Sequence, residues 1–157
     1  MDSRPVRPSP LERKGAAPVQ RPLRIVVADD DRDAVLTLVM LLRQEGYDVR
    51  GVYSGDDVMK VSRELQPDVI ILDITMPGMS GYELARKLRA RYEDACPLLI
   101  AVTAWDKTSD RILSERVGFN HHFGKPVDPQ ALMRLLAALS QKVGPQNLNK
   151  PLSSGAT

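Results

Sequence analysis

The sequence predicts an α/β fold in which a doubly wound parallel sheet carries helices on both faces. Two observations predict it. Short runs of β-branched and other apolar residues alternate five times with longer segments whose apolar residues recur at the helical period. Several of the runs are apolar at nearly every position, which is typical of parallel strands buried on both faces. Because crossovers between parallel strands are right-handed, such a chain forms an open sheet between two helical layers.

The first two repeats define the pattern. A strand is expected at 24–28, and a helix follows whose apolar stripe runs over 35–42 at positions i, i+3, i+4 and i+7. Gly46 is the expected end of this helix. The second strand is expected at 48–53, and the apolar residues of 58–65 indicate the second helix.

The remaining three repeats follow the same pattern. The strands are expected at 68–73, 98–103 and 119–123. The helices after them are expected around 84–88, 106–117 and 132–139. The segment 106–117 has few apolar residues, so we expect this helix to be lightly anchored to the sheet.

Composition and charge exclude several classes of protein. The chain is 43% hydrophobic and 27% charged, as an ordinary globular protein is, and no segment approaches the roughly 20 apolar residues of a membrane span. The net charge of +2 does not predict nucleic-acid binding, because the excess positive charge lies towards the chain ends rather than on one structured face. We expect a cytoplasmic protein that contacts neither nucleic acid nor membrane.

The chain has room for one domain. Residues 1–22 are rich in Pro and Arg and contain no apolar run, so they do not form a secretory signal and are expected to be a disordered tail. We place the domain at 23–141 and a flexible tail at 142–157. The single cysteine, Cys96, is expected to pack in the core.

Polar residues follow four of the five strands. They are Asp29, Asp30, Asp31, Asp73, Thr103 and Lys125. Parallel strands end at one edge of the sheet, where ligands of such folds bind. Converging carboxylates repel one another unless they take up protons or hold a cation, and Mg²⁺ is the usual ion where a phosphate also binds. Any one acid alone is more often a helix cap or a solvated side chain, and Asp31 or Asp33 is expected to cap the first helix.

These residues lie in strings that resemble the receiver domain of response regulators. The strings are RIVVADDD from Arg24, IILDITMPGMSG over 70–81, AVTA over 101–104 and KP at 125–126, and they span about residues 23–141 in the family's order. The stretch GFNHHFGKPVDP over 118–129 resembles receivers attached to, or working beside, hybrid histidine kinases.

The resemblance implies a flavodoxin-like (β/α)5 fold with strand order 2-1-3-4-5. It implies that Asp73 accepts a phosphoryl group and that Thr103 and Lys125 contact it. It also implies a Mg²⁺ ion held by Asp29, Asp30, Asp73 and the backbone carbonyl of Thr75, and a cis peptide bond before Pro126. Charge neutralisation by Mg²⁺ and the Lys125 ammonium is what a carboxylate nucleophile needs to approach an anionic phosphorus.

Four residues near the expected site qualify this interpretation. His122 occupies the position where the family commonly has an aromatic switch residue. It is either a switch or, more commonly for such a histidine, an ordinary hydrogen-bonded side chain. Its neighbour His121 is expected on the opposite face of the strand, which disfavours a two-histidine metal site. Trp105 and Thr75 flank the phosphate in the family's arrangement, and we hypothesise that they tune its lifetime.

The sequence thus predicts a single-domain response regulator. It would be phosphorylated by a sensor or hybrid histidine kinase or a phosphotransfer protein and would signal by phosphorylation-dependent binding of a protein target. It would catalyse only its own phosphotransfer and autodephosphorylation. The alternatives are a degenerate receiver that serves as a binding module, and an aspartyl-phosphate phosphatase, which would usually carry an Asp where Thr75 stands. A flavodoxin-like cofactor site is disfavoured, because three adjacent acids follow the first strand.

Overall fold

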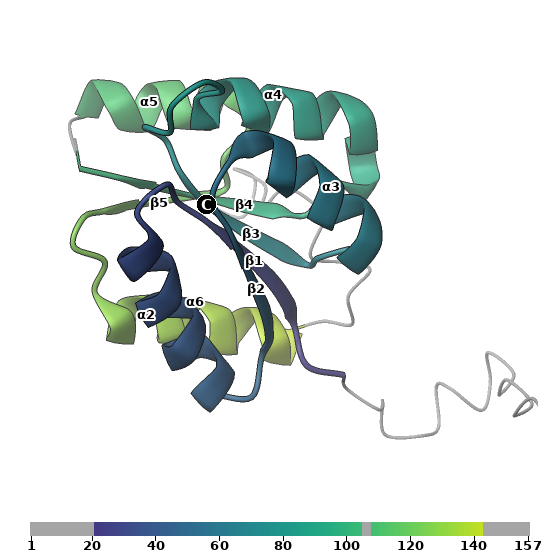
Figure 1. The fold of residues 1–157 in the computed structure, drawn as a ribbon, viewed down its shortest axis with the longest axis vertical. Helices are drawn as coiled ribbons and strands as arrows, with labels where there is room; N and C mark the ends of the chain where they lie inside the picture. The colour runs from purple at the N-terminus through teal and green to yellow at the C-terminus, as the bar shows by residue number, and fades with distance from the viewer. Residues whose placement is uncertain (1–20, 105–107, 143–157) are drawn as a thin grey trace, which may run out of the picture.

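The computed structural model describes residues 21–104 and 108–142 (Figure 1). The strands are β1 (Arg24–Ala28), β2 (Asp48–Val52), β3 (Val69–Asp73), β4 (Leu98–Thr103) and β5 (His121–Gly124). They form one sheet in the order β2-β1-β3-β4-β5, and every pair is parallel. The predicted doubly wound sheet and its strand order are confirmed.

Helices cover both faces of this sheet. They are α2 (Arg32–Gln44), α3 (Gly55–Leu65), α4 (Gly81–Tyr92), α5 (Thr108–Val117) and α6 (Pro129–Lys142), with a short 3-10 turn η1 (Glu93–Ala95) after α4. Figure 1 shows α2 and α6 on one face and α3, α4 and α5 on the other. None of the helices in the described ranges is long and apolar enough to cross a bilayer.

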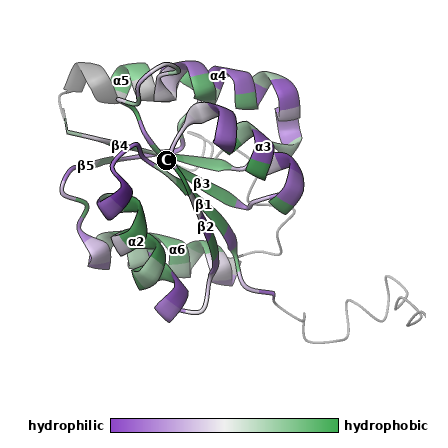
Figure 2. Ribbon diagram, viewed as in Figure 1, coloured by the Kyte–Doolittle hydropathy of each residue, from purple (hydrophilic) through white to green (hydrophobic). Residues whose placement is uncertain are grey.

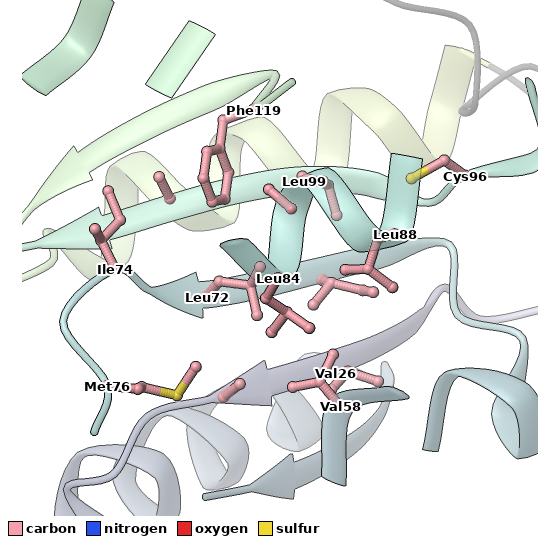
Figure 3. Close-up of a cluster of buried hydrophobic side chains, with 14 of the residues drawn as sticks. Val26, Val58, Leu72, Ile74, Met76, Leu84, Leu88, Cys96, Leu99 and Phe119 are labelled. Carbon is pink, nitrogen blue, oxygen red and sulfur yellow. The ribbon is translucent and has the colours of Figure 1, made fainter. Parts of the chain in front are cut away.

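The alternation of side chains along each strand divides the core into two layers. Val26, Leu72 and Leu99 belong to the layer under α3 and α4, which Figure 3 shows with the buried Cys96 at its edge. Ile25 and Ile71, their neighbours in the strands, belong to the layer that packs against α2 and α6. In Figure 2 the central strands β1, β3 and β4 are accordingly hydrophobic over most of their length, while hydrophobic and hydrophilic residues alternate along the helices. Cys96 packs in the core as predicted.

Side-chain caps fix where the helices begin at the functional edge of the sheet. The carboxylate of Asp31 accepts hydrogen bonds from the backbone N–H groups of Asp33 and Ala34, so Asp31 is the cap of α2. Ser54 and Ser80 cap α3 and α4 in the same way. Each such cap typically contributes about 1 kcal/mol, and together they set the exit directions of the chain after the strands.

The predicted start of the fifth strand is wrong by two residues. Phe119 lies in the core before the strand begins, and β5 runs over His121–Gly124 instead of 119–123. The cause is Asn120, whose side-chain oxygen accepts a hydrogen bond at 2.8 Å from the backbone N–H of Leu99 and so takes the place of a ladder carbonyl. Smaller differences concern the second and third strands, which are each one residue shorter than predicted, at Asp48–Val52 and Val69–Asp73.

The helix expected at 106–117 is described from Thr108 onward, as α5. Of its predicted apolar contacts only Val117 is buried, whereas Ile112 is 48% and Leu113 40% exposed. Among the side chains of α5 that the structure describes, few apolar residues are buried, in line with the light anchoring that we expected. Trp105 lies outside the described residues.

At the edge of the sheet opposite the acids at the ends of β1 and β3, a buried carboxylate stabilises the chain through hydrogen bonds. Asp68, just before β3, is 5% exposed and accepts hydrogen bonds from Arg21 at 2.7 and 2.9 Å and from the backbone N–H of Arg24 at 2.9 Å. Arg21 was predicted to belong to the tail of residues 1–22, but it contacts the domain. This interaction raises the pKa of Arg21, mainly through its hydrogen bond to Asp68, although partial burial opposes the shift.

Two glycines near the end of β3 provide a test of the fold. A Cβ on Gly81 would lie 2.7 Å from the Cα of Ile74 and 2.9 Å from the carbonyl oxygen of Asp73. Because these atoms are backbone, we expect Gly81→Ala to lower the free energy of unfolding by about 2–3 kcal/mol, as overpacked cores do. Urea denaturation followed by circular dichroism measures it.

Gly78 is the matched control. It has φ +82° and no atom within 4 Å of an added Cβ, so Gly78→Ala carries only the cost of a left-handed backbone, about 1–2 kcal/mol. Equal losses of unfolding free energy for both variants would show that α4 packs against β3 less closely than in the structure.

Candidate functional site

The candidate site lies where the strand order reverses. β1 is followed along the chain by β2 on one side and then by β3 on the other, so the carboxyl ends of β1 and β3 flank a crevice, as ligand sites in doubly wound sheets do. Asp29 follows β1 and is 7% exposed; Asp73 ends β3 and is 2% exposed. The sequence prediction that these two acids share one edge of the sheet is therefore confirmed.

Lys125 connects the two carboxylates. Its Nζ lies 2.9 Å from Oδ2 of Asp29 and 3.4 Å from Oδ2 of Asp73. The peptide bond between Lys125 and Pro126 is cis, as the resemblance implies. Since this lysine follows β5, two strands away from β3, its long side chain spans the end of β4 to reach the acids.

The second oxygen of each carboxylate is held by the local backbone. Oδ1 of Asp29 accepts a hydrogen bond from the N–H of Asp31 at 3.0 Å. Oδ1 of Asp73 accepts two from Thr75, one from the backbone N–H at 3.1 Å and one from the hydroxyl at 3.2 Å. Both acids are thus fixed in orientation, and Thr75 lies directly against the predicted nucleophile.

The pKa values of the two acids shift in opposite directions. Burial disfavours the charged form of Asp29, but the Asp31 N–H and the Lys125 ammonium outweigh it, so the pKa of Asp29 lies below its ordinary value. For Asp73, burial and the nearby charge of Asp29 outweigh the Thr75 N–H and Lys125, so the pKa lies above the ordinary value. Partial burial disfavours the charge on Lys125, but the hydrogen bond to Asp29 prevails and raises the pKa of the lysine.

The clustered carboxylates have too little positive charge around them, so the site favours a bound cation. Carboxylate oxygens of Asp29, Asp30 and Asp73 lie within 4.8 Å of one another, and Asp30 is exposed at the open side. An oxygen-only donor set with an open side fits a hard divalent ion that keeps several waters, as Mg²⁺ does. Asp29, Asp30 and Asp73 would hold it, and the backbone carbonyl of Thr75 stays a prediction as a further ligand.

The other predicted residues lie on β4 and β5. Thr103 is 2% exposed at the end of β4, and its carbonyl accepts a hydrogen bond at 2.8 Å from the N–H of Lys125. His122 lies opposite Ala101 in the ladder, on the face covered by α5, while His121 lies opposite Ile100. The two histidines therefore point to opposite faces, as predicted, and a role for His122 as a switch stays a prediction.

One polar network was not anticipated from the sequence. Arg89 of α4 donates hydrogen bonds to the carbonyl of Gly118 at 2.9 Å and to Oδ1 of Asn120 at 2.6 Å. This cation ties α4 to the segment that leads into β5. An arginine within a helix carries no sign of such a role in its sequence pattern, and only the Gly and Asn just before the fifth strand mark the segment that it would bind.

Asp68 and Asp73, at the two ends of β3, have opposite electrostatic environments. Replacing each by asparagine should therefore change the free energy of unfolding in opposite directions. Without Mg²⁺, we expect Asp73→Asn to raise the free energy of unfolding at pH 7 by about 1 kcal/mol, since it removes a buried charge that Asp29 repels. The pKa of Asp73 is higher in the folded than in the unfolded state. The charged form therefore costs stability above the folded pKa, and the gain should vanish as pH falls towards the ordinary value. Thermal unfolding at several pH values measures both effects.

Asp68→Asn is the control. It weakens charge-assisted hydrogen bonds to Arg21 and Arg24, so we expect a loss of about 2 kcal/mol at pH 7. Equal destabilisation by both substitutions would contradict the account of Asp73 as the acid with the less favourable environment.

Comparison with known proteins places this geometry in a family. The profile of the response regulator receiver domain matches residues 25–137. Protein PilH of Pseudomonas aeruginosa is 31% identical over 116 residues, which cover 74% of this chain and 96% of PilH.

Solved structures agree. A response regulator from Chloroflexus aurantiacus has 28% sequence identity and a TM-score of 0.69 over 77% of this chain and 99% of its own. The BeF3-activated receiver domain of RstA from Klebsiella pneumoniae has 27% identity and a TM-score of 0.69 over 76% and 99%. CheY4 of Vibrio cholerae, at 22% identity and a TM-score of 0.69 over 75% and 98%, shares the fold. The chain belongs to the response regulator receiver domain family.

Proposed function

We propose that the protein is a single-domain response regulator that accepts a phosphoryl group on Asp73 from a histidine kinase or a phosphotransfer protein. The observation that carries the proposal is the contact of a buried Asp73 carboxylate with the Lys125 ammonium, next to the acids Asp29 and Asp30. PilH supports the single-domain form, because a match of receiver size covers 96% of that relative.

The chain's own groups suit phosphoryl transfer. A carboxylate oxygen of Asp73 attacks phosphorus, the bond from phosphorus to the imidazole nitrogen of the donor breaks, and its electron pair stays on that nitrogen. Lys125 offsets negative charge on the phosphoryl oxygens, and the Thr103 hydroxyl is proposed to contact one of them. Bound Mg²⁺ would supply further charge neutralisation at the acids. Thr75 holds the nucleophile in place through its two hydrogen bonds.

The proposed output is a change in affinity for a protein target. Phosphorylation adds roughly two negative charges at the end of β3. The nearby elements able to respond are β5, which is joined to Thr103 through the Lys125 N–H, and α5, which exposes Ile112 and Leu113. A weakly packed helix with exposed apolar residues shifts position at low cost, so this face is the proposed docking surface.

Two further features belong to the proposal. The protein would work in the cytoplasm, and its phosphodonor would be a sensor or hybrid histidine kinase or a phosphotransfer protein. Receiver domains are signalling modules rather than classical enzymes, and the only reactions proposed for this chain are its own phosphorylation and dephosphorylation. Thr75 stands where an aspartyl-phosphate phosphatase would usually carry its general acid, so the phosphatase alternative gains no support.

Incubation with Mg²⁺ and acetyl phosphate, followed by intact-mass measurement, tests phosphoryl acceptance. We expect the mass of one phosphoryl group to be added to the wild-type chain and to Asp68→Asn, and nothing to be added to Asp73→Asn. Chelation of the metal should abolish the modification. A wild-type chain that stays unmodified with acetyl phosphate and also with phosphoramidate would favour the degenerate receiver, and modification of Asp73→Asn would place the phosphoryl group elsewhere.

The lifetime of the phosphoryl group tests the role of its neighbours. Thr75 lies against Asp73, and Trp105 follows Thr103 by two residues, so both are proposed to control water access to the acyl phosphate. We expect Thr75→Asn and Trp105→Ala to change the dephosphorylation rate by about threefold to tenfold, a barrier change of about 1 kcal/mol. The decay of the phosphorylated mass after removal of acetyl phosphate measures the rate. Unchanged lifetimes for both variants would rule out this role.

A further inference from the structure

A cavity of about 590 Å³ lies beside the acidic site, on the face of the sheet that carries α2 and α6. One wall is α2, and the other is the connection from β5 to α6, which includes Pro126 and Val127. Small-molecule sites in proteins typically have volumes of roughly 300–1,000 Å³. The cavity is therefore large enough for a small organic molecule, far more than phosphoryl transfer to Asp73 requires.

The body of the cavity is apolar. Val27, Ile71 and Val102 from three adjacent strands form its floor, and Leu38 and Leu41 project from α2. Leu38 and Leu41 are only half-buried, so a ligand that covered them would remove apolar surface from water. Nothing in the proposed phosphoryl chemistry uses these aliphatic side chains.

The mouth of the cavity is negatively charged. Four carboxylates line it, from Asp29, Asp31, Asp33 and Asp73, against the single ammonium of Lys125. Lys125 contacts Asp29 and Asp73, which leaves Asp31 and Asp33 at the α2 side of the mouth. In the absence of bound Mg²⁺, this distribution repels an anion and favours a ligand that carries positive charge at one end.

We propose that this cavity binds a small organic cation with an apolar body, such as a primary amine attached to an aromatic or branched hydrocarbon group. The hydrocarbon lies between α2 and the β5–α6 connection, and the ammonium faces the acids at the mouth. Because the cavity shares Asp29 and Asp73 with the proposed Mg²⁺ site, the amine and the metal each lower the affinity of the other, as linkage requires. The protein thereby gains a second input besides its phosphodonor.

Titration of the ¹⁵N-labelled full chain in Mg²⁺-free buffer tests the site. Three probes share a phenyl group and differ in charge: 2-phenylethylamine, 2-phenylethanol and 3-phenylpropionate. We expect saturable shifts at amides of α2 and of the segment 125–129, with the amine bound about tenfold more tightly than the carboxylate and the alcohol in between. The absence of saturable shifts with the amine, or equal affinity for the carboxylate, would overturn the proposal.

Variants of α2 locate the site. Ala34 and Thr37 line the cavity, so Ala34→Phe fills it, and we expect amine affinity to fall about tenfold. Thr37→Trp, which starts from an exposed side chain on the same wall, gives a second filling variant if Ala34→Phe does not fold. Leu36→Ala is the matched control, because Leu36 is 57% exposed on the same helix and outside the cavity lining. The affinity of Leu36→Ala for the amine should stay within about twofold of wild type.

Charge and metal provide the last readouts. Asp33→Asn should weaken amine binding about threefold and leave the alcohol unchanged, and saturating Mg²⁺ should weaken the amine by a similar factor. Affinity that survives both filling variants would show surface association instead of the proposed site. So would shifts concentrated around Leu36 and Met40, two exposed residues of α2 outside the cavity lining. Since no phosphodonor is present, failure of phosphoryl acceptance at Asp73 leaves this result untouched, and the reverse also holds.

Discussion

The structure depends on how two buried carboxylates are kept next to each other. Asp29 and Asp73 end adjacent strands, and the Lys125 ammonium lies 2.9 and 3.4 Å from their oxygens. Isolated buried charges are costly, whereas charges that are paired and hydrogen-bonded are tolerated. The strand order, the caps of α2 and α4 and the segment that leads into Lys125 all place these three groups. Lys125 does not fully offset the charge of the two acids, because the pKa of Asp73 stays above its ordinary value. A divalent cation would supply the missing positive charge.

Much of the fold followed from the sequence because its signals are local. The alternation of apolar runs with helical periods gave the strands to within one or two residues, and the strand ends identified the edge where the acids meet. The resemblance to receiver domains supplied the strand order and the cis bond before Pro126. Asp29, Asp73 and Lys125 were predicted together and lie together: the two acids stand at the ends of the neighbouring strands β1 and β3, and the long side chain of Lys125 reaches them across the end of β4.

The features that sequence reasoning missed depend on contacts between distant segments. The start of β5 was misplaced because the Asn120 side chain replaces a ladder carbonyl, which an apolar pattern does not reveal. Arg21 was assigned to a tail, although its guanidinium pairs with a buried aspartate 47 positions away. The cavity beside α2 depends on how far this helix and the β5–α6 connection lie from each other over the sheet. In the sequence Leu38, one of its leucines, belongs to the apolar stripe of the first helix and looks like an ordinary core residue.

The central claim is that Asp73 holds the phosphoryl group and that the neighbouring acids hold the metal. A crystal structure of the chain with Mg²⁺ and beryllofluoride, a stable mimic of an aspartyl phosphate, tests it most directly. The account predicts the fluoride adduct on the Asp73 carboxylate in contact with Lys125 and Thr103, and a metal ion in contact with Asp29, Asp30, Asp73 and the carbonyl of Thr75. An adduct on another residue, or a metal ion that ignores Asp29 and Asp30, would contradict it.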